Sequence, residues 1–314
     1  MPQPQPISEP GNAVSAIDAL EGAIAFAEKG SPAALVAAPA DWEAAISRLL
    51  PDLRSRLDRI MLAKDPEAGL DALLACGALT ALLPEVQALV GFGDGEWRHK
   101  DVWKHTKQVV RQAVPRLEVR WAALLHDVGK VKTRSISPSG EVHFFGHAEV
   151  GARMFDRLNR RLPLFDADAA LKSSVRFLIL HHLRANQYEG DWTDSAVRRF
   201  AREMGGNLDD LLCLSRADIT TKRPEKKRRG LEQISELAQR IRTLAEQDAV
   251  LPALPSGVGD AIMQAFQLRP SRLVGDIKRE LTTAVEAGEI GARLENEAYV
   301  EFVRERKARF GLPE

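Results

Sequence analysis

A histidine and an aspartate, His126 and Asp127, stand side by side at the end of an apolar run that is typical of a helix. An imidazole nitrogen and a carboxylate oxygen that face one point form a ligand pair suited to a divalent transition metal or to magnesium. By itself, the pair is equally typical of a helix that ends in polar residues. However, all seven histidines lie between positions 99 and 182. Histidines that only stabilise a core would be scattered, so the clustering favours a metal site.

Further side chains of ligand type stand at other predicted helix ends or turns. The helical patterns cover about residues 101–114, 119–125, 168–180 and 208–217, and another helix begins at residues 146–147. Each carries one candidate ligand or pair of ligands. In order along the chain, these are His105, the pair His126 and Asp127, His147, the pair His181 and His182, and Asp218.

Most of the remaining sequence is also helical in pattern, and strand patterns are almost absent. We therefore predict an all-α fold. Residues 1–12, with prolines at positions 2, 4, 6 and 10, are predicted to be a disordered tail. The other predicted segments are an N-terminal helical region (13–95), a metal-binding domain (96–222) and a C-terminal helical region (223–314).

Residues 133–145 are the exception to the helical pattern. Ile136, Val142 and Phe144 alternate with polar neighbours on the two sides of a Pro-Ser-Gly turn. This pattern predicts a small β-hairpin or an extended flap beside the site. His143 falls on the face opposite Val142 and Phe144, where it either faces solvent or contacts a substrate.

The composition excludes several classes of protein. The chain has 314 residues and a formal net charge of zero, so its overall field does not require nucleic acid as a partner. Cys76 and Cys213 lie far apart without a Cys-x-x-Cys partner, which disfavours a disulfide framework or a thiolate zinc site. No apolar run approaches the ~18 residues that span a bilayer, and the N-terminus does not have the pattern of a signal peptide. We therefore expect a soluble, cytoplasmic protein without a membrane partner.

The ordered series H…HD…H…HH…D resembles the HD-domain superfamily of metal-dependent phosphohydrolases. The resemblance implies an all-α HD-domain bundle with the metal site between helices. It also implies one ion bound by His105, His126, Asp127 and Asp218, with Asp127 as a bridge to a second ion. The ligands of that second ion would be His147, His181 and His182. Neighbouring residues cannot face the same way in a regular helix, and of the last two His181 is preferred slightly.

Catalysis in this family type implies roles for Asp127 and for Lys130, which matches the lysine of the HDxxK element and would face phosphate oxygens. Arg184, Lys222 and Arg223 are further candidates for contact with the substrate. The expected cofactor is a divalent metal, with two ions favoured and with Mg, Mn, Fe, Ni and Co not distinguished.

A narrower resemblance covers roughly residues 56 to 290. The segments RIMLAKDPEAGLDALLACGALTALLPEV, HKDVWKHT and GVGDAIMQAFQLRPSRLVGDIKRELTTAVEAGEI are similar to the body of bacterial CCA-adding tRNA nucleotidyltransferases and poly(A) polymerases. Those enzymes carry a catalytic head whose paired carboxylates hold magnesium. The Asp-x-Asp of this chain, Asp166 to Asp168, has the pattern of a helix N-cap instead, so the polymerising activity is not carried over.

Three functions remain open. The favoured one is a phosphomonoesterase or phosphodiesterase that attacks a nucleotide, a cyclic phosphate or an RNA end with hydroxide at a two-metal site. The second is a non-catalytic body that binds tRNA or another RNA through basic residues such as Lys222, Arg223 and the run 226–229, which otherwise is a solvated loop. The third is a di-iron oxygenase, since the ligands are shared. The oligomeric state stays open.

Overall fold

The computed structural model of the chain describes residues 16–30, 42–93, 101–250 and 253–312. They fold into two compact units, each built from two stretches of the sequence. The first unit takes residues 1–187 and 209–231 and the second takes residues 188–208 and 232–314, as far as these are described. The predicted tail at 1–12 and His99 lie outside the described residues. The segment limits inferred from the sequence remain a proposal.

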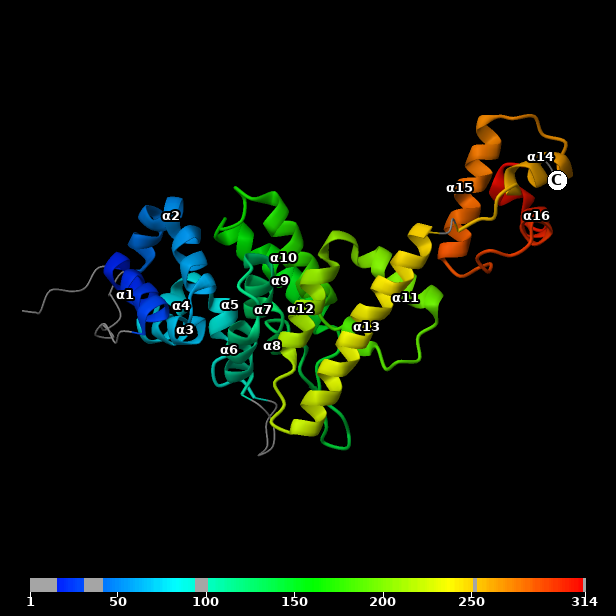
Figure 1. Cartoon of the computed structure of the whole chain (residues 1–314). Helices are drawn as coiled ribbons and strands as arrows, with labels where there is room; N and C mark the ends of the chain where they lie inside the picture. Colours follow the sequence, from blue (N-terminus) through cyan, green and yellow to red (C-terminus); the bar gives the residue numbers. More distant parts are fainter. Residues whose placement is uncertain (1–15, 31–41, 94–100, 251–252, 313–314) are drawn as a thin grey trace, which may run out of the picture. The chain divides into compact units, whose positions relative to one another are not determined.

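The described part of the first unit is helical, which confirms the predicted all-α class. Its helices are α1 (Ala16–Lys29), α2 (Trp42–Leu62), α3 (Pro66–Ala75), α4 (Ala78–Leu82), α5 (Pro84–Gln87), α6 (Val102–Gln112), α7 (Leu117–Leu125), α8 (Lys130–Thr133), α9 (His147–Arg161) and α10 (Ala169–His181), followed by the 3-10 turn η1 (Ala185–Gln187). Helix α12 (Leu208–Asp218) begins at the boundary of the unit, and α13 (Pro224–Val250) runs from the first unit into the second. Figure 1 shows this order of elements by colour along the chain.

Helix α7 forms the centre of the first unit. Its residues from Val119 to Leu125 are all buried, because the helix packs against α2, α6 and α10. Arg120 is buried as well, and its guanidinium donates hydrogen bonds to the carbonyl oxygens of Ala113, Met61 and Ala63. Helix α10 in turn packs against α9. The carboxyl ends of α7 and α10 and the amino end of α9 are therefore fixed relative to one another.

The predicted hairpin is present. Strands β1 (Ser135–Ile136) and β2 (Val142–His143) are antiparallel, with Ser135 opposite His143 and Ile136 opposite Val142. The hairpin leads directly into α9, which begins at His147.

The second unit contains α11 (Asp194–Met204), η2 (Gly205–Asn207), α14 (Val258–Ala265), α15 (Arg272–Glu286), α16 (Asn296–Arg304) and η3 (Lys307–Phe310), together with most of α13. Tyr299 is fully buried in the core between α14, α15 and α16. Its hydroxyl donates to the carbonyl oxygen of Gly291 at 2.8 Å and accepts from the Leu294 N–H at 3.2 Å. Among the helices in the described ranges, none has the length and the apolar composition needed to cross a membrane.

Candidate metal centre

Five helices of the first unit bring the predicted ligand residues to their ends or early turns. Helix α6 carries His105, the end of α7 carries His126 and Asp127, and α9 begins with His147. Helix α10 ends at His181, with His182 as its C-cap, and α12 ends at Asp218. Figure 1 shows α6, α7, α9, α10 and α12 in one region of the first unit.

Four of these residues form a first group. Nε2 of His105 lies 3.0 Å from Oδ1 of Asp218 and 3.5 Å from Oδ2 of Asp127. Nε2 of His126 lies 3.6 Å and 3.2 Å from the same two oxygen atoms. Two imidazole nitrogens and two carboxylate oxygens therefore converge on one point, which is a donor set that suits a divalent transition metal.

A second group shares Asp127 with the first. The other carboxylate oxygen of Asp127, Oδ1, lies 3.6 Å from Nε2 of His147. Nε2 of His147 in turn lies 3.2 Å from Nε2 of His182. One ligand atom from each of these three residues lies within 4.8 Å of the others, and the same holds for His105, His126 and Asp127.

Backbone hydrogen bonds determine which nitrogen of the imidazoles faces the centre. Nδ1 of His126 lies 2.8 Å from the carbonyl oxygen of Ala123. Nδ1 of His147 lies 2.8 Å from the carbonyl oxygen of Phe144, and Nδ1 of His182 lies 2.7 Å from that of Ile179. A carbonyl only accepts, so each Nδ1 carries its proton and each Nε2 points to the centre. In neutral His147 and His182, the two Nε2 lone pairs then face each other at 3.2 Å. A cation between them removes this repulsion, so the residues fit a metal.

Burial and charge act differently on the two groups. Burial disfavours the charged form of His126, but Asp127 and Asp218 outweigh this effect and raise the pKa of His126 to about 10. Burial also opposes the ionisation of Asp218, yet hydrogen bonds from the two histidines of the first group hold its pKa well below the usual range. Burial lowers the pKa of His182 to about 4. The second group therefore consists of neutral imidazole beside a carboxylate, which is the protonation state that binds metal.

The structure differs from the sequence-based preference for His181. The ring of His181 packs on Phe177, with ring centroids 4.3 Å apart, whereas His182 lies beside His147. The rotation of about 100° between neighbouring helical residues separates the two rings, and only the residue at the C-cap faces the centre.

Two glycines allow the His-Asp turn and α9 to come together. A Cβ atom on Gly129 would lie 2.0 Å from the carbonyl oxygen of His147 and 2.7 Å from the backbone nitrogen of Gly151. A Cβ on Gly151 would lie 3.3 Å from the side chain of Ile179 in α10. The backbone of α9 therefore touches the turn that carries Asp127, and any side chain at position 129 would separate them.

The remaining predicted residues lie as follows. Nζ of Lys130 is 2.7 Å from Oδ2 of Asp127 and 5.6 Å from the ring centroid of Phe144. Arg184 is partly buried just after α10, and Lys222 and Arg223 are exposed between α12 and α13.

The basic run is not the loop that the sequence predicted. Helix α13 begins at Pro224, so residues 224–229 are helical. Proline is favoured in the first turn of a helix because its missing N–H has no helical partner there. The run therefore presents its charges from a helix.

Thr220 has a positioning role that the sequence did not reveal. Its hydroxyl lies 2.8 Å from Nδ1 of His105, and so takes the place that a backbone carbonyl has for the other three rings. Its position two residues after Asp218 is the only signal that could have suggested it.

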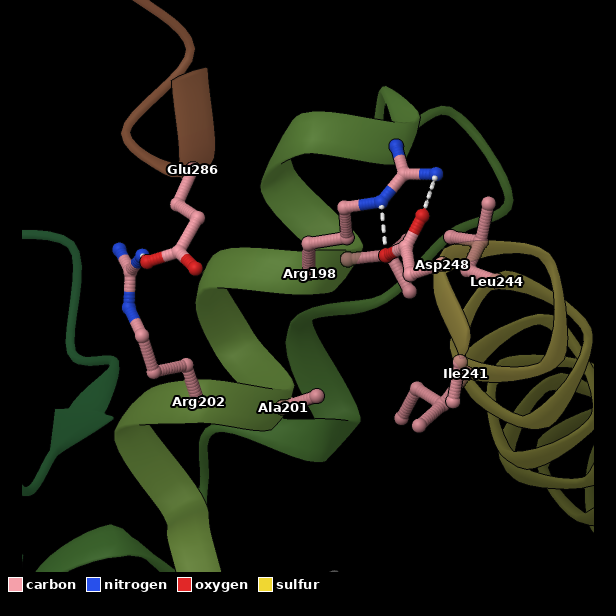
Figure 2. Close-up of a pocket in the computed structure, with 9 residues that line it drawn as sticks. Arg198, Ala201, Arg202, Ile241, Leu244, Asp248 and Glu286 are labelled. Atoms are coloured by element: carbon pink, nitrogen blue, oxygen red, sulfur yellow. Dashed lines mark hydrogen bonds and ion pairs between the residues drawn. The ribbon is translucent and has the colours of Figure 1, made fainter. Parts of the chain in front are cut away.

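A separate cavity of about 240 Å³ lies in the second unit, lined by residues of α11, α13 and α15 (Figure 2). Arg198 forms two hydrogen bonds with Asp248, at 2.7 and 2.9 Å, and Arg202 pairs with Glu286 at 2.5 Å. Because its charged groups neutralise one another, this cavity has no unpaired charge to offer a phosphate or a metal.

A helical bundle with a buried His/Asp centre at its helix ends is the architecture of an HD domain, and residues 102–223 match the HD domain family. The chain therefore contains an HD domain, and the matched residues include every candidate ligand from His105 to Asp218.

The similarity extends beyond that domain. The chain is 32% identical over 257 residues to an A-adding tRNA nucleotidyltransferase of Deinococcus radiodurans, covering 79% of this chain and 57% of the relative. It is 31% identical over 261 residues to a CC-adding tRNA nucleotidyltransferase of Thermus thermophilus, covering 80% and 56%. A multifunctional CCA protein of Ectopseudomonas mendocina is 37% identical over 111 residues, covering 33% of this chain and 26% of the relative. The chain resembles the HD-containing body of these enzymes, and it spans little more than half the length of the first two relatives.

Proposed function

We propose that the protein is a metal-dependent phosphohydrolase that acts on a nucleotide, a cyclic phosphate or an RNA end. The observation that carries this proposal is that two groups of ligand atoms share Asp127. A shared carboxylate is the arrangement expected for two neighbouring divalent ions. When bound, such ions supply Lewis acidity to water and to the phosphoryl oxygens.

The side chains of the centre divide the work that remains. Asp127 directs Oδ2 to the first group and Oδ1 to His147, so it would hold both ions in register. Asp127 also fixes the ammonium group of Lys130 at its edge, with Nζ 2.7 Å from Oδ2. From there, Lys130 would meet the negative charge that develops on the phosphoryl oxygens, where a fixed charge stabilises the transition state more than the ground state.

The test is metal content measured together with phosphate release. Asp127→Ala is expected to lose both ions and all hydrolysis, because it removes a ligand from both groups. His147→Ala is expected to keep the ion of the first group. Asp52→Ala, at an exposed position of α2, is the control and should retain both. If the metal-loaded parent protein neither releases phosphate from nucleotides or RNA ends nor opens a cyclic phosphate to the monoester, the proposal is wrong.

An RNA-binding body is the second candidate, and the exposed basic residues near Asp218 support it. Lys226, Arg228 and Arg229 are exposed in the first turns of α13, close in sequence to exposed Lys222 and Arg223. Two relatives that match about four fifths of this chain are named as tRNA nucleotidyltransferases. RNA held by these residues would bind in a strongly salt-dependent way.

Charge neutralisation at residues 226–229 separates this candidate from the enzyme. Changing Lys226, Lys227, Arg228 and Arg229 to Gln should weaken the binding of single-stranded RNA and flatten its salt slope by roughly 0.7 per lost contact. Hydrolysis of a mononucleotide should change little. Unchanged RNA affinity would leave these residues as a solvated helix surface.

A further inference from the structure

Phe145 is exposed to an unusual degree for an aromatic side chain. It is 77% exposed, although it stands only two residues before His147 of the metal centre. Removing a large apolar ring from water is energetically favourable. A ring held in solvent next to a candidate active site is therefore available for a ligand to cover.

His143 holds the ring of Phe145 in a defined orientation. The two ring centroids are 5.0 Å apart and the planes are inclined by only 15°, so the rings are stacked. Phe145 stands in the turn that follows β2, and the stacking of its ring on His143 places both side chains on the same side of the chain. With His143 behind it, the ring of Phe145 presents its other face to solvent.

Phe144 anchors the same segment on the opposite side. Its ring lies 6.3 Å from that of Phe92 and 5.6 Å from the ammonium group of Lys130, measured to the ring centroids. Its carbonyl oxygen accepts the hydrogen bond from Nδ1 of His147 at 2.8 Å. One residue therefore connects the stacked rings, the lysine and a candidate metal ligand.

Gly146 makes the sharp change of direction between the ring and the ligand. Its φ of +71° belongs to the left-handed region, which glycine adopts without strain. Two residues of chain span at most about 7 Å, so Phe145 cannot move far from His147. In a nucleotide, the ribose separates the base from the phosphate by a similar distance.

We propose that Phe145, supported by His143, is a stacking platform for the nucleobase of a phosphate ester held at the metal centre. This inference rests on the proposed hydrolase function and names its substrate class, namely phosphate esters that carry a base. An aromatic platform stacks on the π-face that all bases share, so it selects for the presence of a base and discriminates little between bases.

Two ligands that differ only in the base provide the test. Adenosine 5′-monophosphate and ribose 5-phosphate share the sugar and the phosphate. Each is titrated calorimetrically into the parent protein in the presence of Mn²⁺. Stacking on an aromatic residue contributes about 1–3 kcal/mol, so the nucleotide should bind about 5- to 150-fold more tightly.

Variants of Phe145 test whether this residue causes the difference in affinity between the nucleotide and ribose 5-phosphate. Phe145→Ala should bring the two affinities close together, and Phe145→Trp should keep or increase the difference. Ile136 is the matched control, because it is 61% exposed on the same hairpin but pairs with Val142 on the other face. Ile136→Ala should leave the ratio unchanged.

The outcomes for the platform and for the hydrolase are separate. The platform is wrong if the parent protein binds the two ligands equally or does not bind the nucleotide. It is also wrong if the ratio of the two affinities is the same in Phe145→Ala as in the parent. Hydrolysis would add a continuing heat after each injection and free phosphate at the end. Base-dependent binding by a protein that hydrolyses no nucleotide, cyclic phosphate or RNA end would keep the platform and reject the hydrolase.

Discussion

Two neighbouring histidines at the end of α10 have opposite surroundings. His182 is buried with its Nε2 3.2 Å from that of His147, whereas His181 packs on Phe177. We expect His182→Ala to lose about one equivalent of metal and His181→Ala to lose none. Mass spectrometry of the metal content after dialysis measures the difference. Equal losses in the two variants would mean that both rings reach the centre.

Lys130 contacts Asp127 but is not an expected ligand. Lys130→Ala should therefore keep the fold and the metal, yet lower turnover by a factor on the order of 10²–10³, as loss of a charge-stabilising donor does. Lys130→Arg should recover only part, because a planar guanidinium does not replace a compact ammonium group. Steady-state rates at equal metal occupancy measure this. A parent-like rate in Lys130→Ala would limit the lysine to balancing the charge of Asp127.

At this scale, the sequence predicted the order of the candidate ligands but not their orientation. Helical periodicity placed His105, His126, His147 and Asp218 at helix ends or early turns, and the resemblance to the HD-domain family assigned them to one site. Periodicity does not fix the direction in which the side chain at a C-cap points. That direction determines that His182, and not His181, faces the centre. A contact between a loop hydroxyl and a ring, such as that of Thr220 with His105, follows from tertiary packing and has no periodic signal.

At the scale of elements, Gly129 controls how closely α9 approaches the turn after α7. A Cβ atom there would meet the carbonyl of His147 at 2.0 Å. Gly129→Ala should therefore destabilise the fold by about 1–3 kcal/mol or more and reduce metal content. Chemical denaturation measures the free energy of unfolding. Gly22→Ala in α1 is the control, since a Cβ there meets nothing within 4 Å and should not destabilise the protein.

The N-cap of α10 makes a pH-dependent contribution to stability. The hydrogen bond from the Leu171 N–H, together with Arg54, lowers the pKa of Asp168 from its ordinary value of 3.8. A lowered folded-state pKa gives stability that is present above the unfolded pKa and is lost as the pH falls through the folded pKa. The urea midpoint of Asp168→Asn should thus lie below that of the parent at neutral pH.

The difference between Asp168→Asn and the parent should shrink as the pH falls below the ordinary aspartate value of 3.8, because the folded carboxylate of Asp168, whose pKa is lowered, then takes up a proton. Asp52→Asn in α2 is the matched control and should show a difference that is small at every pH. A difference for Asp168→Asn that stays constant with pH would show that its carboxylate is not stabilised in the fold.

Elements were predicted well where one local pattern determined them. Alternation around a Pro-Ser-Gly turn predicted the hairpin, and apolar periodicity predicted the helices of the HD domain. The basic run was assigned to a loop because its charges hide any apolar stripe. Pro224 at the first position of α13 was the helix signal that outweighed them.

At the scale of the whole molecule, the two units should respond to different changes. Metal bound only to the native first unit stabilises that unit, by about 2.7 kcal/mol at 100 times its Kd. Chelation with EDTA should therefore lower its thermal transition. Tyr299→Phe should instead lower the free energy of unfolding of the second unit by about 1 kcal/mol, and with it the thermal transition of that unit, because the Leu294 N–H and the Gly291 carbonyl lose their shared partner.

Calorimetry with and without EDTA on both proteins measures the two effects. Metal content should be the same in Tyr299→Phe and in the parent. A single transition that moves equally with chelation and with the substitution would contradict independent units. The sequence did not predict this division, because residues 188–208 join the second unit although residues 209–231 belong to the first.

The bonds from Nδ1 to the backbone give the centre an uneven tolerance to mutation. His126, His147 and His182 are each held by the carbonyl three residues earlier, and every residue type supplies that carbonyl. Their orientation can therefore persist while the neighbouring side chains change over evolutionary time. His105 is different, because a replaceable hydroxyl on Thr220 holds its ring. Loss of that hydroxyl is therefore expected to reorient one imidazole and to leave the other three in place.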